Sequence, residues 1–346
     1  MTGYSRRDTL KGIGAAGTVG MVGLAGCAAQ EPAEEGTEES ASTEPISIGS
    51  IFPVTGTNSP YGGGHQEAFN QAIQEMNDAG GPLYREVVSI NRDTEGKPEQ
   101  AAQKFRTMIN QDGIVGLVGP YSSGIGTVLA PIAADNRVMQ MSNGNTSPSL
   151  ATAGVNDDNG VKYYGRTAPN DVQQALVVAR VMNQKIEADS ASFLYVDNPY
   201  GQGLAEAAAE AFDGEVLSLQ AYTQQTNDYT STLDALFADD PDAVGAVMYP
   251  GNGRTIMNQW SQGGYGGEWT FAEAIWSPQL IEDLADIFQG MYITSPQTAD
   301  SATFQESLGG KENVTQFAPH AYDGTYLTGL ALQAAGTATG TGIAEN

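Results

Sequence analysis

Cysteine and histidine are almost absent from this chain. Cys27 is the only cysteine among 346 residues, so no intramolecular disulfide and no cysteine-ligated zinc or iron–sulfur cluster can form. The two histidines, His65 and His320, are each expected at the start of a helix, where such side chains are usually exposed. No G-x-S-x-G nucleophile motif accompanies them. The sequence therefore predicts neither an enzyme nor a metal site nor any other cofactor.

Positive charge is also scarce. Lys and Arg number 15 against 41 Asp and Glu, which gives a net charge of -26. A surface this negative repels phosphate backbones, which excludes nucleic acid as a partner. Without the first 27 residues, 12 basic and 40 acidic side chains remain, a net charge of -28. Salt screens such self-repulsion, so the composition favours a halophilic, haloarchaeal source; an ordinary acidic extracellular protein is the alternative.

Long apolar runs are missing as well. The Gly/Ala-rich run at 12–26 is shorter than the ~20 residues of a membrane span but fits the core of a signal peptide. The preceding "SRRDTLK", with Arg6 and Arg7, resembles a twin-arginine export signal. The following "LAGC" resembles a lipobox that ends at Cys27. Residues 1–27 are therefore predicted to be a signal peptide with Cys27 as the lipidation site; a retained anchor with unmodified Cys27 is the alternative.

The segment "GIGAAG" within this run formally matches the dinucleotide-binding pattern G-x-G-x-x-G. That pattern binds a pyrophosphate only where a strand leads into it and a helix follows it. Here the pattern lies inside the predicted leader, so we do not interpret it as a nucleotide site.

Residues 28–45 contain six glutamates and no basic residue, with mostly small or polar residues otherwise, and are predicted to be a flexible acidic tether.

From Ile46 onward, short β-branched segments alternate with segments of helical periodicity. Strands are expected at 46–54, 85–93, 113–119, 138–142, 191–197, 215–222, 243–249, 268–274 and 290–296. Helices are expected at 66–78, from 98 to about 109, through 128–132, and at 171–184, 202–212, 229–237, 255–262, 278–287 and about 320–335. Such alternation predicts parallel sheets covered by helices on both faces. The length suits two lobes, and the Gly/Asn-rich segment 143–171 separates the two series.

Polar loops follow the expected strands. They lie at 54–64, 119–126, 142–150, 197–203, 250–254 and 273–276. Open α/β sheets bind ligands at the carboxyl ends of their strands, and hydroxyls and helix N-termini there suit a carboxylate. The same Gly, Ser, Asn and Tyr residues also serve turns that bind nothing.

Several of these segments carry a family resemblance. They are "IGSIFPVTGTNSPYG", "NDAGG", "VGPYSSG", "MSNGNTSPSL", "YGRTAPND", "DNPYGQG" and "HAYDGTYL", in this order and spacing. The chain from Ile46 to about Ala335 resembles the type I periplasmic binding proteins, specifically the branched-chain amino acid binding family of ABC importers. The resemblance implies an α/β fold of two doubly wound lobes with parallel sheets joined by a hinge. It also implies one lobe from 46–165 and 296–346 and the other from 166–295.

The resemblance further implies roles for individual residues. Ser123 and the main chain at Gly144 match donors to a ligand carboxylate, and Thr146 matches the threonine that bridges to the ammonium. Glu273 matches the acidic partner of that ammonium. Tyr61 and Tyr200 match aromatic positions that line the ligand pocket, and Trp276 is a further candidate for its lining. Tyr121 and Asn252 depart from the family pattern, which bears on the preference for the ligand side chain. Ser122 and Asn145 are candidates as neighbours in the same loops.

The expected function is therefore that of an extracytoplasmic, lipid-anchored protein at the cell surface that delivers a branched-chain or other aliphatic amino acid to an ABC importer. Three alternatives stay open. Glu273 could be an ordinary surface glutamate, the ligand could be an amide or urea, and the module could serve a ligand-sensing receptor. Family members continue past the helix at 320–335 with another strand and a hairpin, so the sequence is expected to be a partial one.

Overall fold

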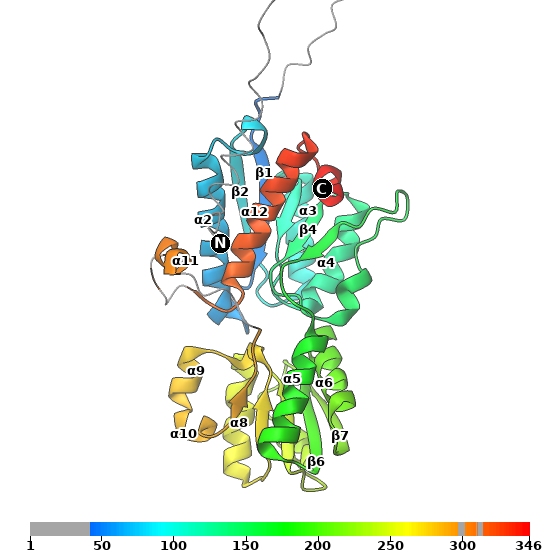
Figure 1. The fold of residues 1–346 in the computed structure, drawn as a ribbon, viewed down its shortest axis with the longest axis vertical. Helices are drawn as coiled ribbons and strands as arrows, with labels where there is room; N and C mark the ends of the chain where they lie inside the picture. The colour runs from blue at the N-terminus through cyan, green and yellow to red at the C-terminus, as the bar shows by residue number, and fades with distance from the viewer. Residues whose placement is uncertain (1–41, 297–301, 309, 311–313) are drawn as a thin grey trace, which may run out of the picture.

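A computed structural model of the chain describes residues 42–296, 302–308, 310 and 314–346. The predicted leader with Arg6, Arg7 and Cys27, and most of the predicted tether, lie outside these residues. Figure 1 shows two lobes stacked along the long axis, with helix α12 (Ala318–Ala335), near the C-terminus, returning to the lobe that holds β1.

The first lobe is built on a parallel sheet with the strand order β2-β1-β3-β4-β5. Its strands are β1 (Ile46–Phe52), β2 (Val87–Asp93), β3 (Gly116–Val118), β4 (Met139–Ser142) and β5 (Tyr164–Arg166). The apolar side chains of α2 (Ser59–Asp78), α12 and α13 (Gly340–Glu345) pack on one face. Those of α3 (Pro98–Asn110) and α4 (Ser123–Asp135) pack on the other. The sheet is therefore doubly wound.

The second lobe repeats this plan with the strand order β10-β9-β8-β6-β7, again parallel. Its strands are β6 (Ser190–Val196), β7 (Glu215–Tyr222), β8 (Ala243–Val247), β9 (Glu268–Phe271) and β10 (Tyr292–Ile293). Its helices are α5 (Asp171–Val181), α6 (Pro199–Ala211), α7 (Thr230–Leu236), α8 (Pro250–Gly263), α9 (Pro278–Asp283) and α10 (Ala285–Phe288). Short turns are η1 (Pro82–Tyr84), η2 (Pro148–Thr152), η3 (Met182–Ile186) and η4 (Glu273–Ile275), and α11 covers Ala302–Ser307.

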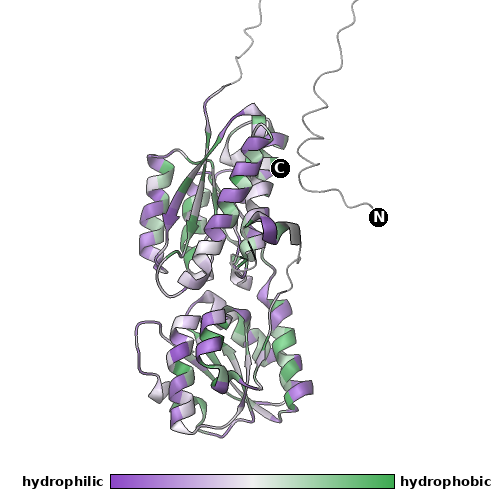
Figure 2. Ribbon diagram, turned by 90° about the vertical axis from the view of Figure 1, so that its left-hand side faces the viewer, coloured by the Kyte–Doolittle hydropathy of each residue, from purple (hydrophilic) through white to green (hydrophobic). Residues whose placement is uncertain are grey.

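In both lobes hydrophobic residues concentrate on the central strands, while the helices carry both hydrophobic and hydrophilic residues (Figure 2). This arrangement follows from parallel strands whose two faces are both covered. The predicted α/β fold of two doubly wound lobes is confirmed.

Several helices begin with an asparagine that caps the first turn or with a proline in that turn. The Asn198 side chain accepts hydrogen bonds from the N–H groups of Tyr200 and Gly201 at the start of α6. Asn170 caps α5 in the same way through Val172 N–H. Proline stands in the first turn of α2, α3, α6 and α8, where its missing N–H costs no hydrogen bond.

Some predicted boundaries are wrong, because helices begin earlier than the glycine-rich loops suggested. Helix α2 starts at Ser59 rather than 66, and α8 starts at Pro250 rather than 255. A Cβ on Gly62 would lie 2.1 Å from the Pro53 carbonyl oxygen, so this glycine permits close packing rather than a turn. His65 consequently lies inside α2 and is fully buried, which corrects the expectation of an exposed histidine at a helix end.

Three other differences involve short or divided elements. Strand β5 was missed, because three residues are too few to show a period of two. The helix predicted at 278–287 is divided into α9 and α10, and the one at 171–184 gives way to the π-turn η3 after Val181.

Candidate ligand-binding site

The loops at the carboxyl ends of the two sheets contact each other. Tyr61, in the first turn of α2, donates hydrogen bonds from its hydroxyl to the carbonyl oxygens of Ala274 (2.6 Å) and Trp276 (2.9 Å), which follow β9. The Ser147 hydroxyl, after β4, donates to the Pro199 carbonyl oxygen at 2.8 Å. Strand-end loops of both lobes therefore form one shared region.

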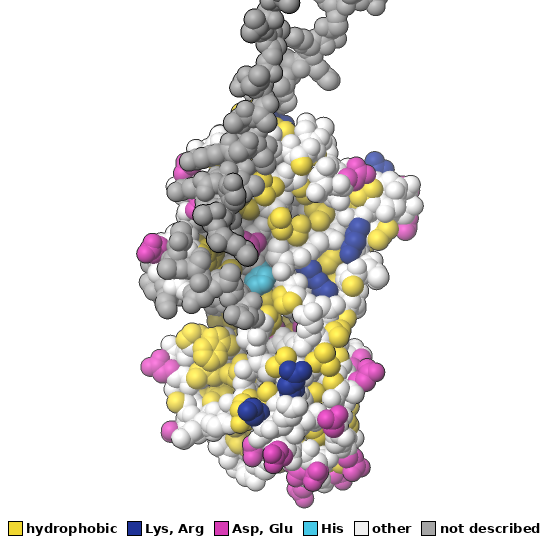
Figure 3. All heavy atoms as spheres, viewed as in Figure 1, with side chains coloured by type: hydrophobic (Ala, Val, Ile, Leu, Met, Phe, Trp, Pro, Cys, Tyr) yellow, Lys and Arg dark blue, Asp and Glu magenta, His cyan; other side chains and the backbone are white. Residues whose placement is uncertain are grey.

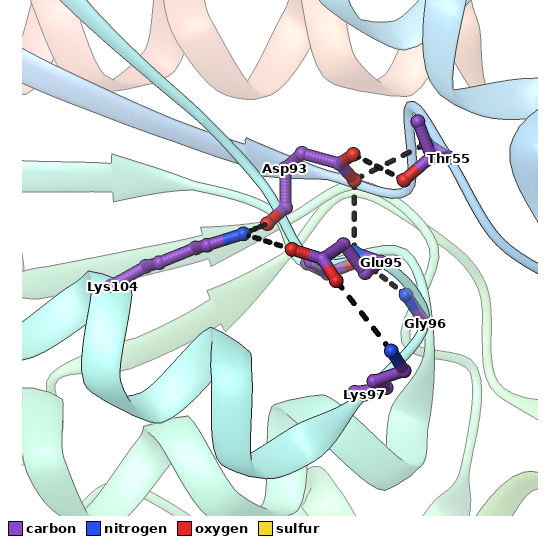
Figure 4. Close-up of polar contacts among 7 residues, drawn as sticks. Thr55, Asp93, Glu95, Gly96, Lys97 and Lys104 are labelled. Atoms are coloured by element: carbon purple, nitrogen blue, oxygen red, sulfur yellow. Dashed lines mark hydrogen bonds and ion pairs between the residues drawn. The ribbon is translucent and has the colours of Figure 1, made fainter.

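A polar network fixes the loop that leads from β1 into α2 (Figure 4). The N–H and hydroxyl of Thr55 donate to the two Asp93 carboxylate oxygens at 3.2 and 2.6 Å. Lys104 donates to the Asp93 carbonyl oxygen at 2.8 Å and to Glu95 at 2.7 Å. Burial alone would raise the pKa of Asp93, but hydrogen bonds from Thr55 and the Glu95 N–H outweigh it and hold that pKa below its usual range. The loop that precedes Tyr61 is thus fixed by hydrogen bonds to the ionised carboxylate of Asp93.

Two buried carboxylates lie in the shared region. Glu273, in η4, and Asp171, the first residue of α5, are each 1% exposed. Glu273 Oε2 and both Asp171 carboxylate oxygens have no hydrogen-bond partner among the described residues. A buried carboxylate without a partner is costly, so these oxygens are poised for a cation or a hydrogen-bond donor.

The two carboxylates influence each other. Burial raises the pKa of Glu273 to about 7, and interactions with Gln174 and Tyr200 only partly offset that effect. Burial also raises the pKa of Asp171 well above its usual value, and the nearby charge of Glu273 adds to the shift. Glu273 is therefore a buried residue, which removes the alternative of an ordinary surface glutamate.

Four buried tyrosines surround this pair. Tyr61 and Tyr121 come from the first lobe with ring centroids 5.1 Å apart, and Tyr200 and Tyr249 come from the second lobe with rings stacked at 5.8 Å. Burial raises the pKa of all four hydroxyls, and the charge of Glu273 raises each further. The Tyr200 hydroxyl lies close enough to Glu273 to lower the pKa of that carboxyl against the effect of burial. The four tyrosine rings thus provide an aromatic surface beside the two carboxylates.

The loop after β4 brings hydroxyls to the same region. Ser123 and Thr146 are both 1% exposed, and Ser123 Oγ accepts the Ser147 N–H at 3.2 Å, which leaves its own proton free to donate. Thr146 interacts with the Asp171 carboxylate and lowers its pKa against the effect of burial. A carboxylate-bearing ligand would therefore find hydroxyl donors close to an acidic partner for its ammonium.

Gly144 and Asn145 play a structural part in this loop. Their N–H groups donate to the Ser142 hydroxyl at 3.3 and 2.9 Å. The Asn145 amide donates to the carbonyl oxygens of Pro120 and Tyr121, both at 3.0 Å. Both residues hold the loop that carries Thr146.

Three other candidates lie at the margin of the tyrosine cluster. Asn252 donates to the Tyr229 hydroxyl at 2.7 Å, inside the second lobe. The Trp276 side chain is 47% exposed, although its carbonyl oxygen accepts from Tyr61. Ser122 precedes α4 and interacts with the Tyr249 hydroxyl, lowering its pKa against the effect of burial.

A cavity of about 290 Å³ opens beside Asp171 where the chain crosses between the lobes. Its lining includes Thr146, Asn170, Asp171, Gln174 and Thr294. Gln174 donates from its amide to Thr294, and its own amide oxygen is buried without a partner among the described residues. The volume is close to the lower end of the range for small-molecule sites.

His65 packs against the rings of Tyr61 and Tyr121. Its ring lies 5.3 Å from that of Tyr121 and stacks at 6.4 Å on Tyr61, while Nε2 contacts the Gln316 carbonyl oxygen at 2.6 Å. Burial lowers the pKa of His65 to about 4, so the ring is neutral at pH 7 and Nε2 donates its proton. Within the described ranges, no three His, Cys, Asp or Glu side chains gather to hold a metal ion.

The sequence analysis missed Asp171, Gln174 and Tyr249 as site residues. Asp171 follows Asn170, and both residue types cap helices, so the sequence suggested a cap rather than a ligand contact. Its burial, which only the structure shows, marks Asp171 as a site residue, since Asn170 already provides the cap. Tyr249 closely follows the buried strand β8, a position that the strand-end argument should have included.

The chain resembles known proteins along most of its length. A model of the family described as "Periplasmic binding protein" matches residues 45–346. The chemotactic signal transduction system substrate-binding protein BasB of Halobacterium salinarum is 31% identical over 308 residues, 87% of this chain and 73% of that protein. The Leu/Ile/Val-binding protein BraC3 of Rhizobium johnstonii is 28% identical over 218 residues, 62% of this chain and 57% of that protein.

Solved structures share the fold. The branched-chain amino acid transporter substrate-binding protein LivJ of Streptococcus pneumoniae, in complex with isoleucine, has a TM-score of 0.73 and 22% identity, with 86% of each chain covered. The leucine binding protein LivK of Thermotoga maritima has a TM-score of 0.75 and 22% identity, with 87% of this chain and 86% of that chain covered. With a family model that matches nearly the whole two-lobed body, and with BasB related over most of it, this chain belongs to the periplasmic binding protein family.

Proposed function

We propose that this protein is an extracytoplasmic solute-binding lipoprotein that captures a branched-chain or other aliphatic amino acid and delivers it to the membrane subunits of an ABC importer. The observation that carries the proposal is the pair of buried carboxylates, Glu273 and Asp171: Glu273 Oε2 and both Asp171 oxygens lack a hydrogen-bond partner among the described residues. The proposal includes the absence of catalysis and of any cofactor.

The chemistry of the region suits a zwitterion. Carboxylates bind an ammonium through charge-assisted hydrogen bonds, and the hydroxyls of Ser123 and Thr146 can donate to a carboxylate. Aromatic walls at Tyr61 and Tyr200 would cover an apolar side chain. Relatives named as Leu/Ile/Val-binding proteins support an aliphatic amino acid as the ligand.

A sensory role is the second candidate. It is favoured by one specific observation, the relationship to BasB, whose name assigns it to a chemotactic signal transduction system. The same two-lobed body would then report an occupied site to a membrane receptor rather than to an importer. An amide- or urea-binding specificity is the remaining alternative for the ligand.

Titration calorimetry of the Glu273→Gln variant tests the ligand class. If Glu273 pairs with an ammonium, its loss is expected to cost about 2 to 5 kcal/mol of binding free energy, since the partner charge is left buried. At roughly 1.4 kcal/mol per tenfold, leucine, isoleucine and valine should then bind at least about 30-fold more weakly. An uncharged amide should be unaffected.

The matched control is Glu268→Gln, because Glu268 is an exposed glutamate at the start of β9. It is expected to leave affinity unchanged. Unaltered amino-acid binding by the Glu273→Gln variant would refute the zwitterion site. Binding of the amide alone would move the assignment to the amide and urea relatives.

Location is the other part of the proposal. Residues 1–27 would direct export through Arg6 and Arg7, Cys27 would carry the lipid, and residues 28–45 would tether the body to the membrane. Among the described residues, no helix has the length and hydropathy to cross a bilayer. The division into a lobe of 46–165 with 296–346 and a lobe of 166–295 also belongs to the proposal.

Two variants test this location. Replacement of Arg6 and Arg7 by Lys is expected to hold the precursor inside the cell, and Cys27→Ser is expected to give exported protein without lipid, as intact-mass measurement would show. Normal export of the double-Lys variant would contradict the twin-arginine assignment.

A further inference from the structure

The loop that carries Thr146 is held by hydrogen bonds to three consecutive carbonyl groups. The Arg166 guanidinium donates from Nη1 to the carbonyl oxygens of Asn145 at 3.0 Å and of Ser147 at 2.8 Å. The N–H of Asp171 donates to the carbonyl oxygen of Thr146 itself at 3.0 Å. The main chain on both sides of Thr146 is therefore fixed by donors from outside the loop.

These donors come from the segment that joins the two lobes. Arg166 is the last residue of β5, and Asp171 is the first residue of α5. Between them, Thr167 donates from its N–H to the Ser142 carbonyl oxygen at 3.0 Å and from its hydroxyl to the His320 carbonyl oxygen at 2.8 Å. The loop after β4 is thus bound directly to the connection between the lobes.

The charge of Arg166 is not used in an ion pair. Within the part of the chain that the structure describes, Arg92, Lys104 and Arg254 each pair with a carboxylate, whereas Arg166 forms no such pair. Figure 3 shows Lys and Arg atoms of the upper lobe near the boundary between the lobes, next to uncharged side chains. A guanidinium stays charged and carries several N–H donors, so Arg166 can serve both carbonyl oxygens at once.

The candidate site depends on where this loop lies. The Thr146 side chain is 1% exposed and interacts with the Asp171 carboxylate. The N–H of Ser147 donates to the Ser123 hydroxyl at 3.2 Å. A shift of the main chain at 145–147 would therefore move both hydroxyls that we propose as donors to the ligand carboxylate. Groups that are held in place before the ligand arrives bind it more tightly.

We infer that Arg166 is a positioning residue of the ligand site, which presets the Thr146 hydroxyl by bridging the carbonyl oxygens of Asn145 and Ser147. Arg166 acts through Thr146 rather than on the ligand. The inference rests on the proposed function for the identity of the ligand, and it adds a residue whose side chain the sequence analysis did not single out. Its role differs from that of a residue that only stabilises the fold, since it concerns one loop.

Titration calorimetry with leucine tests the effect on binding. Arg166→Met keeps the length of the side chain but removes its charge and its donors, so leucine should bind about tenfold more weakly. Arg166→Lys should lose about threefold, because its shorter side chain reaches the two carbonyl oxygens less well. This variant also carries the comparison if Arg166→Met does not fold. Arg92→Met is the matched control at a partly exposed arginine of β2 and should leave the affinity unchanged.

A double variant separates positioning from a general effect of charge. Arg166 also lowers the pKa of Asp171 through its charge, which could influence the ligand without Thr146. If Arg166 acts through Thr146, Arg166→Met combined with Thr146→Val should bind leucine within about twofold of the weaker single variant. If the charge acts independently, the two losses should multiply.

Hydrogen–deuterium exchange gives a readout that needs no ligand. In Arg166→Met the peptide that spans residues 142–150 should exchange at least about tenfold faster, while other peptides of the first lobe and the thermal midpoint stay unchanged. Faster exchange throughout the lobe with a lower midpoint would indicate a structural role only. If the unaltered protein binds no leucine, the proposed function fails, and the exchange of this peptide then decides the inference alone.

Four results would overturn the inference. They are unchanged leucine affinity in both Arg166 variants, losses that multiply in the double variant, faster exchange of the whole first lobe, and exchange of residues 142–150 that is no faster than in Arg92→Met. Weaker binding, losses that do not multiply and faster exchange confined to this loop would together support it.

Discussion

Burial without a counter-charge is the dominant property of Glu273. Burial raises the pKa of its carboxyl to about 7, while that of a carboxyl in an unfolded chain is near 4.3. The folded protein therefore binds this proton more tightly than the unfolded chain does. Its stabilising contribution is complete below about pH 4.3 and is lost as the pH rises through about 7.

The pH dependence of unfolding should reveal this residue. The thermal midpoint of the ligand-free Glu273→Gln variant is expected to exceed that of the unaltered protein by a margin that grows between about pH 4.5 and 7. His65 and His320, whose pKa burial lowers to about 4, act in the opposite direction over this window. They are present in both proteins and cancel in the difference. A constant margin, or an equal one for Glu268→Gln, would contradict the buried pair.

At the scale of elements, helix α2 and the turn η4 are joined by one side chain. The Tyr61 hydroxyl donates to two carbonyl oxygens that flank the end of η4, and the Tyr61 carbonyl oxygen accepts from Thr315 at 3.0 Å. Because η4 carries Glu273, these contacts position the carboxylate while they connect the two lobes. Tyr61 is therefore a positioning residue at the lobe contact.

Tyr61→Phe should weaken ligand binding chiefly through faster dissociation. The loss of one neutral hydroxyl donor corresponds to about 1 kcal/mol, or roughly fivefold in affinity. Stopped-flow displacement of bound leucine would measure the dissociation rate. Tyr84→Phe is the control, because Tyr84 is 78% exposed. An unchanged dissociation rate for Tyr61→Phe would show that the lobe contact does not retain the ligand.

At the scale of the whole molecule, unbalanced negative charge is the main feature. The described residues form few ion pairs, and most of them lie near the surface, where each is worth little. Repulsion among the remaining carboxylates opposes the compact state and is screened by salt.

The thermal midpoint should therefore climb as KCl is raised from about 0.1 M to above about 2 M, because the Debye length falls from ~10 Å to below ~3 Å. A variant with Glu67, Glu99 and Glu210 changed to Gln provides the control, since all three are exposed. Its midpoint should rise less steeply with salt. Equal slopes for the two proteins would remove the electrostatic explanation.

The amino-acid sequence by itself determined the alternation of strands and helices, the two sheets and the position of Glu273 at a strand end. These features depend on local patterns: apolar periods of two and 3.6, prolines and asparagines at helix starts, and β-branched runs. The motifs at strand ends also indicated the family. The sequence could not place short elements such as β5, whose strand character comes from pairing with β4.

Only the tertiary structure decided which side chains meet. Asp171 and Glu273 are far apart in the chain, and they meet because helix α5 packs beside strand β9 within the second lobe. The approach of the two lobes brings Tyr61 to η4, and the packing of α2 on the first sheet places His65 in the interior. Desolvation and charge coupling arise from three-dimensional neighbours, which a linear pattern does not specify.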